Sequence, residues 1–154
     1  MSPRAAWRLE TLGFPLAFDY EGGKKDWGTY GLPHEGTSVP AQLAGELARR
    51  DVPTCLLSDV LSDVRERVRA AGWDTCIVVN PQRIVLGRLG RKAMAADTEE
   101  SVEEAMTPGP STVRPSIGVE ALRERMRERK LRSYVVTTPD GRLVGLVRLD
   151  DLTA

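Results

Sequence analysis

Ser133-Tyr-Val-Val-Thr-Thr-Pro-Asp-Gly-Arg-Leu-Val-Gly-Leu-Val147 is the stretch of sequence that decides the fold. Two runs rich in β-formers flank Pro139-Asp-Gly141, a turn signal that joins antiparallel strands, so the stretch predicts a hairpin. The same plan occurs 58 residues earlier, over Thr75–Leu89. The chain therefore contains one structural unit twice.

The repeat extends beyond the hairpins, because Thr54–Met94 aligns with Thr112–Leu152 without a gap. Each copy reads strand–helix–strand–strand, and apolar residues at helical spacing predict one buried stripe per helix: Leu61, Val64, Val68 and Ala71 in the first, Val119, Leu122 and Met126 in the second. Further short helices are predicted at Arg91–Ala96 and Ser101–Met106. A repeat of this length cannot bury its apolar face alone, so the copies are expected to pack together. The groove between them suits a small ligand.

Two local details are less regular. Ser116 is the expected N-cap of the second helix, within a residue or two. The turn of the first copy is less favourable than that of the second, because Arg83 replaces the glycine found at Gly141.

Composition excludes several classes of protein. The chain has 154 residues, with 22 basic and 22 acidic side chains and zero net charge, which argues against a general nucleic-acid or anionic-membrane binder. It lacks an apolar run long enough to span a bilayer and an N-terminal signal stretch, so a cytoplasmic location is predicted. Cys55 and Cys76 are expected to be buried, inert thiols, and a single histidine, His34, makes a metal site improbable.

At this point the sequence resembles a known family. Val102-Glu-Glu-Ala-Met-Thr107, Ser111-Thr-Val-Arg-Pro115, the hairpin ending at Val147, and Asp151 resemble a cystathionine β-synthase (CBS) domain. The tandem resembles a CBS pair, or Bateman module, over residues 51–154.

The resemblance implies an α+β fold in which two β-α-β-β-α motifs pack sheet to sheet about a pseudo-twofold axis. The expected divisions are an N-terminal extension at 1–50, a first motif at 51–106 and a second at 107–154. It also implies a homodimer, clefts that bind adenosine-containing ligands such as AMP, ADP, ATP or S-adenosylmethionine, and a regulatory, non-catalytic role that requires no cofactor.

A weaker resemblance covers residues 1–37. Ala6-Trp7, Leu9, Leu12-Gly-Phe14, Tyr20-Glu-Gly-Gly23, Asp26-Trp27 and Gly31-Leu-Pro33 resemble the C-terminal tail of a rhodanese-like domain. The catalytic cysteine loop of that family would precede Met1, and sulfur transfer needs its thiolate, so no sulfurtransferase activity is expected.

The resemblance also implies a ligand site. Ligand-competent copies end in Gly-h-h-Ser/Thr-x-x-Asp, where h is apolar and the aspartate accepts hydrogen bonds from a ribose diol. The second copy reads Gly145-Leu-Val-Arg-Leu-Asp-Asp151, so Asp151 holds the ribose position. Arg148 replaces the hydroxyl residue, and its guanidinium either binds phosphate or fills the cleft.

Four more residues belong to the expected site. Thr112, Val113 and Tyr134 map to the family's pocket lining, and Arg114 is near enough in sequence to reach a phosphate. In the first copy Gly90 and Ala93 replace the hydroxyl and the aspartate, so at most one cleft per chain is expected to bind.

Several alternatives stay open. Asp151 is also explained as a solvated residue near the chain end, and the arginine-rich helix Arg123–Arg132 as a solvated face. The basic stretch Arg83, Arg88, Arg91 and Lys92 is interpreted as facing the acidic joint of a partner chain. The rival functions are a purely structural dimerisation module and the remnant of a sulfurtransferase.

Overall fold

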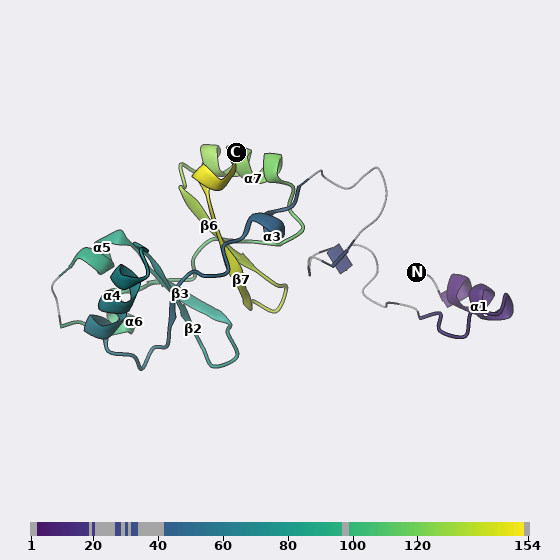
Figure 1. The fold of residues 1–154 in the computed structure, drawn as a ribbon, viewed down its shortest axis with the longest axis horizontal. Coiled ribbons are helices and arrows are strands. Elements are labelled where there is room, and N and C mark those ends of the chain that lie inside the picture. Colours follow the sequence, from purple (N-terminus) through teal and green to yellow (C-terminus); the bar gives the residue numbers. More distant parts are fainter. Residues whose placement is uncertain are drawn as a thin grey trace.

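The computed structural model describes residues 3–18, 20, 27–28, 30, 32–33, 42–96 and 99–152. Figure 1 shows two similar lobes, each a small sheet with helices packed against it. The first contains β1 (Thr54–Cys55), α4 (Leu61–Ala70), β2 (Cys76–Val79), β3 (Val85–Leu89) and α5 (Arg91–Ala95), and the second contains β5 (Thr112–Val113), α7 (Val119–Glu128), β6 (Ser133–Thr137), β7 (Leu143–Arg148) and the 3₁₀ turn Leu149–Leu152.

The two sheets have the same connectivity and register. β1 pairs parallel to β2 and β2 antiparallel to β3, while β5 pairs parallel to β6 and β6 antiparallel to β7. The register shifts at equivalent places, between Val78 and Val79 and between Val136 and Thr137. The predicted repeat and the mixed α+β class are therefore confirmed.

Backbone conformation repeats even where the residue type does not. Arg83 has φ 63°, like Gly141 at φ 83°, and Lys130 has φ 52°, like Gly72 at φ 71°. Left-handed conformation is unfavourable for residues with a β-carbon. Each repeat thus carries one strained position that its twin fills with glycine.

The repeated unit begins earlier than Thr54. The short helix α3 (Ala44–Leu47) is equivalent to α6 (Val102–Ala105), 58 residues later. Beyond these helices Arg49 forms an antiparallel bridge with Leu146, and Thr107 at the start of β4 (Thr107–Pro108) pairs with Arg88 in the equivalent way. Each leading segment therefore crosses over and packs on the sheet of the other repeat.

Two glycines make these crossings possible. A β-carbon on Gly145 would lie 2.6 Å from the carbonyl oxygen of Arg49, and one on Gly87 would lie 2.3 Å from Met106 Sδ. The glycine shared by the two hairpins is thus a requirement of close backbone approach. Residues 42–50, which the sequence groups with the N-terminal extension, pack on the second sheet in this way.

The crossing also explains a wrong prediction. Gly118, not Ser116, is the cap position of α7, and no side chain caps the helix. Gln42 O accepts from Val119 N, and Ile117 O accepts from Ala44 N, at 3.1 and 2.9 Å, so the incoming backbone occupies this end of the helix. The short helix predicted at Ser101–Met106 is confirmed, because Ser101 caps α6 and forms a capping box with Glu104.

The repeats pack sheet to sheet. Alternate residues of β6 divide between two cores: Val135 joins the cluster around Ile77 of β2, whereas Tyr134 and Val136 pack beneath α7. At one end of the seam Ile84 bridges Arg142, the residue equivalent to itself. A bridge between equivalent residues is what a twofold relation requires, so it marks the pseudo-twofold axis.

The N-terminal part is described only in segments. α1 (Pro3–Thr11) lies apart from the lobes in Figure 1, and Trp27 Nε1 donates to Pro33 O at 2.8 Å. Gly22, Gly23, Asp26 and Gly31 of the rhodanese-like motif, together with His34, lie outside the described residues, so that resemblance stays a prediction. No helix within the described part of the chain has the length and apolar character needed to cross a bilayer.

Candidate functional site

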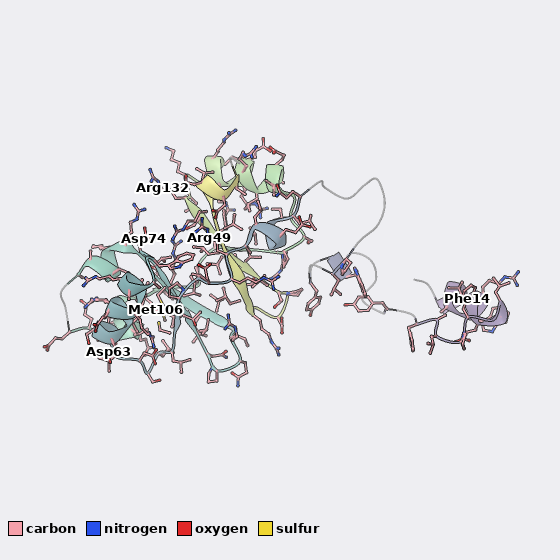
Figure 2. All side chains as sticks on the ribbon, viewed as in Figure 1. Phe14, Arg49, Asp63, Asp74, Met106 and Arg132 are labelled. Carbon is pink, nitrogen blue, oxygen red and sulfur yellow. The ribbon has the colours of Figure 1, made fainter. Side chains whose placement is uncertain are left out.

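A cleft of about 430 Å³ opens at the seam between the repeats, and we call it the seam cleft. Its lining residues come from both lobes: Asp74, Thr75, Arg88 and Arg91 from the first, and Leu131, Arg132, Ser133, Leu146, Arg148, Leu149 and Asp150 from the second. Figure 2 labels Asp74 and Arg132, which approach the seam from opposite lobes. Any ligand held here would touch both repeats.

Positive charge dominates the lining, because four arginines face two aspartates. Arg91 Nε lies 2.5 Å from Asp74 Oδ2, and Arg148 Nη2 lies 3.9 Å from Asp74 Oδ1. The hydrogen bond from Arg91 holds the pKa of Asp74 below its ordinary value, so this carboxylate is ionised at neutral pH. Asp74 is thus shared by two of the arginines.

Arg88 is the most enclosed cation of the cleft. Its Nε donates to Thr75 Oγ1 at 2.9 Å, and Thr75 Oγ1 donates in turn to Leu89 O at 2.8 Å. Within the described ranges the guanidinium forms no ion pair. Burial lowers the pKa of Arg88, and repulsion from Arg148 and Arg91 adds to this, yet arginine stays protonated at neutral pH.

Arg148 lies inside the cleft, as the sequence predicted for a residue in the hydroxyl position. Its guanidinium carbon is 4.2 Å from the ring centroid of Trp73, a cation–π contact that fixes the side chain against the first repeat. The arginine therefore lines the cleft without closing it, and its charge is available to an anion.

Asp151 is engaged within the chain. Arg49 Nε and Nη2 donate to Oδ1 at 3.0 and 2.8 Å, and the backbone amide of Arg148 donates to Oδ2 at 2.9 Å. Arg49 belongs to the crossing segment before β1, so the pair joins the start of the module to its C-terminal turn. The residues at the equivalent positions of the first repeat are Ala93 and Thr107, which form no such pair.

The other predicted site residues lie elsewhere. Val113 and Tyr134 belong to the core beneath α7, on the sheet face opposite Val135, and neither lines the seam cleft. Thr112 is exposed, and Arg114 Nη1 donates to Thr138 O and Thr137 Oγ1 at 2.5 and 3.0 Å. Their role as ligand-binding residues stays a prediction.

Sequence reasoning missed most of the cleft. Arg88 and Arg91 had been interpreted as facing a partner chain and Arg132 as part of a solvated face, but they meet at the seam. Each arginine has a different residue at its equivalent position: Leu146 for Arg88, Leu149 for Arg91, Asp74 for Arg132 and Gly90 for Arg148. Folding one repeat onto the other at the 58-residue spacing is the signal that would have gathered them.

The cysteines take no part in the site. Cys55 and Cys76 are buried at 3% and 0% exposure, as predicted. Contact with the Cys55 thiol, together with burial, raises the pKa of Cys76, so it is an uncharged thiol at neutral pH.

Comparison with known proteins supports a CBS-domain pair. The CBS domain family model matches residues 102–154, which is the second repeat with its leading segment. The fold resembles the cytosolic domain of the Mg²⁺ channel MgtE, solved with ATP, at TM-score 0.66 and 25% identity over 74% of this chain. That match spans 48% of the MgtE chain, so this chain covers about half of its length.

Two smaller proteins match over nearly their whole length. CBSX2 in complex with AMP, a CBS-pair protein from Arabidopsis thaliana, has TM-score 0.63 and 20% identity over 73% of this chain and 93% of its own. The CBS domain pair of protein MJ0100, solved with 5′-methylthioadenosine and S-adenosyl-L-methionine, has TM-score 0.65 and 17% identity over 74% and 94%. The fold is that of a CBS-domain pair.

Proposed function

We propose that this chain is a non-catalytic regulatory module that binds an adenosine-containing ligand in the seam cleft. The observation that carries the proposal is the cleft itself, in which both repeats supply arginines around one space. The ligands in the titles of the similar structures, ATP, AMP, 5′-methylthioadenosine and S-adenosylmethionine, all contain adenosine.

The mechanism follows from the position of the cleft on both sides of the seam. A ligand that contacts both repeats binds best to one relative arrangement of the lobes, and its differential affinity shifts the population toward that arrangement. Arg148 and Arg132 from the second repeat and Arg88 from the first would be the groups that sense occupancy. The regulated partner would read the lobe geometry.

Thermal unfolding with AMP, ADP, ATP and S-adenosylmethionine in turn tests the proposal. A ligand present at 100 times its Kd adds about 2.7 kcal/mol to the unfolding free energy. Arg132→Ala should weaken the stabilisation, because Arg132 is exposed in the cleft and no described side chain depends on it. Arg125→Ala, on the exposed side of α7, is the matched control. Absence of any shift, confirmed by calorimetric titration, contradicts the proposal.

A structural dimerisation module is the second candidate. Gly90 and Ala93 in the first repeat and the internal pairing of Asp151 favour it, since both features reduce what a ligand can engage. We further propose a homodimer for either function. Sedimentation velocity with and without nucleotide separates the two: a dimer that forms regardless of any nucleotide, with no heat of binding, supports the structural module.

A further inference from the structure

The carboxylate of Asp151 has its acceptor positions filled. Besides the bonds to Oδ1, Arg49 Nε lies 3.3 Å from Oδ2, which also accepts the Arg148 amide at 2.9 Å. The Asp151 side chain is 14% exposed, and that of Arg49 is 46% exposed. Burial alone would raise the pKa of Asp151, but the hydrogen bonds from Arg49 and the Arg148 amide outweigh it and the pKa is lowered. The group is therefore an ionised carboxylate with a cation already in place.

A ribose diol gains little by replacing that cation. Hydrogen bonds between a guanidinium and a carboxylate are charge-assisted and about twice as strong as neutral ones. Sugar hydroxyls are neutral donors, so an exchange at Asp151 trades stronger bonds for weaker ones. The release of Arg49 to water offsets part of that loss, and the net contribution of the diol is close to zero.

The opposite holds for an anion. Arg88 forms no ion pair within the described ranges, and Arg91 and Arg148 have only Asp74 between them. A phosphate chain entering the cleft meets guanidinium groups from both repeats without displacing a carboxylate from any one of them. Arginine is also the side chain best suited to bind phosphate oxygens in pairs.

Resting on the proposed function, we infer that the seam cleft recognises its nucleotide by the phosphate chain and not by the ribose diol, with Arg49 as the residue that withdraws Asp151 from recognition. This assigns a ligand class, adenine nucleotides carrying two or three phosphates with or without a 2′-hydroxyl. S-adenosylmethionine, which carries a sulfonium cation, is disfavoured by the arginines.

Calorimetric titration at matched ionic strength tests the inference with four compounds: ATP, 2′-deoxy-ATP, inorganic tripolyphosphate and adenosine. The Kd values of ATP and 2′-deoxy-ATP should agree within about twofold, and tripolyphosphate should compete with ATP, while adenosine should not bind. One hydrogen bond from a neutral hydroxyl is worth about 1 kcal/mol, or roughly fivefold in Kd. A preference of fivefold or more for ATP over 2′-deoxy-ATP overturns the inference.

Variants of Arg49 give an internal test. Arg49→Ala frees Asp151, so ATP should gain severalfold over 2′-deoxy-ATP, and Arg49→Gln should do the same if the alanine variant folds poorly. Loss of the Arg49 charge acts equally on both nucleotides, which makes their ratio the informative readout. Arg125→Ala should leave the ratio at its original value. An unchanged ratio in both Arg49 variants overturns the role assigned to Arg49.

The outcomes also separate the inference from the function on which it rests. If tripolyphosphate binds and no adenosine compound does, the proposed function fails while phosphate recognition stands. If adenosine or S-adenosylmethionine binds as tightly as ATP, the function stands and the inference is overturned. Arg88→Ala should weaken ATP and tripolyphosphate by the same factor, and retention of full affinity for both overturns the location in the seam cleft.

Discussion

The two repeats share their backbone and differ in the side chains placed on it. Register, bulges and left-handed positions recur at the same spacing, yet the second repeat ends in Arg148 and Asp151 where the first has Gly90 and Ala93. The first repeat in turn supplies Arg88 and Arg91 to the shared cleft. Packing constrains the backbone in both copies alike, whereas the cleft needs each chemical group only once, so the copies are free to divide these groups between them.

The two hairpin glycines offer the strongest way to break the symmetry. Gly145 faces the backbone of Arg49, while Gly87 faces the flexible side chain of Met106. Gly145→Ala should lower the unfolding free energy by about 3 kcal/mol and Gly87→Ala by about 1 kcal/mol, because a backbone carbonyl yields less than a thioether. Urea unfolding of both variants measures the difference. Equal losses would show that the two crossings are equally adaptable.

The hairpins and helices were predictable because their signals are local. Turn residues, strand alternation and helical stripes all act within one repeat, and the 58-residue spacing then fixes the second copy. The crossings were not, because the bridge between Arg49 and Leu146 joins distant segments. Glu46 and Glu104, which occupy the same helical position in α3 and α6, are the one identity that links the leading segments.

The candidate site was predicted only in part, for a related reason. A pattern shows which side of a helix or strand is exposed, but not what the other repeat brings to that side. Arg132 looked like a solvated residue because Asp74 and Arg88 reach it only after the lobes have packed. The pairing of Asp151 was also hidden, since nothing near Arg49 in the sequence indicates a partner so far along the chain.

Exchanging residues between equivalent turns sharpens the comparison at a smaller scale. Lys130 has the left-handed conformation that Gly72 has in the first repeat. Lys130→Gly should raise the unfolding free energy by about 1 kcal/mol, because left-handed backbone costs about that much for a residue with a β-carbon. The reverse change, Gly72→Lys, should lower it by a similar amount. Thermal unfolding checks both, and a loss on Lys130→Gly would mean that the entropy of the unfolded chain dominates.

The pair between Arg49 and Asp151 exists in one repeat only, and pH separates its contribution from the rest. Asp151→Asn should lower the unfolding free energy at pH 7 by up to about 1 kcal/mol, as expected for a partly exposed ion pair. Because the folded pKa of Asp151 lies below its ordinary value of 3.8, the contribution is present above that value and is lost as pH falls through the folded pKa.

Urea unfolding of the wild type and Asp151→Asn between pH 7 and pH 3 measures this dependence. The difference between the two proteins should shrink on acidification, while Asp63→Asn, on the exposed face of α4, should show no such trend. A gap that stays constant down to pH 3 would mean that the ion pair contributes nothing.

The smallest expected effect concerns Tyr134, which stands where the first repeat has Cys76. Its side chain is 1% exposed, and its hydroxyl has no hydrogen-bond partner in the described part of the chain. A buried hydroxyl without a partner costs free energy, so Tyr134→Phe should keep the unfolding free energy or raise it by about 0.5 kcal/mol. Nucleotide affinity should not change, because the ring packs beneath α7 and not at the seam. A weaker Kd for ATP in Tyr134→Phe, with stability intact, would instead restore Tyr134 to the ligand site and show that binding opens the second repeat.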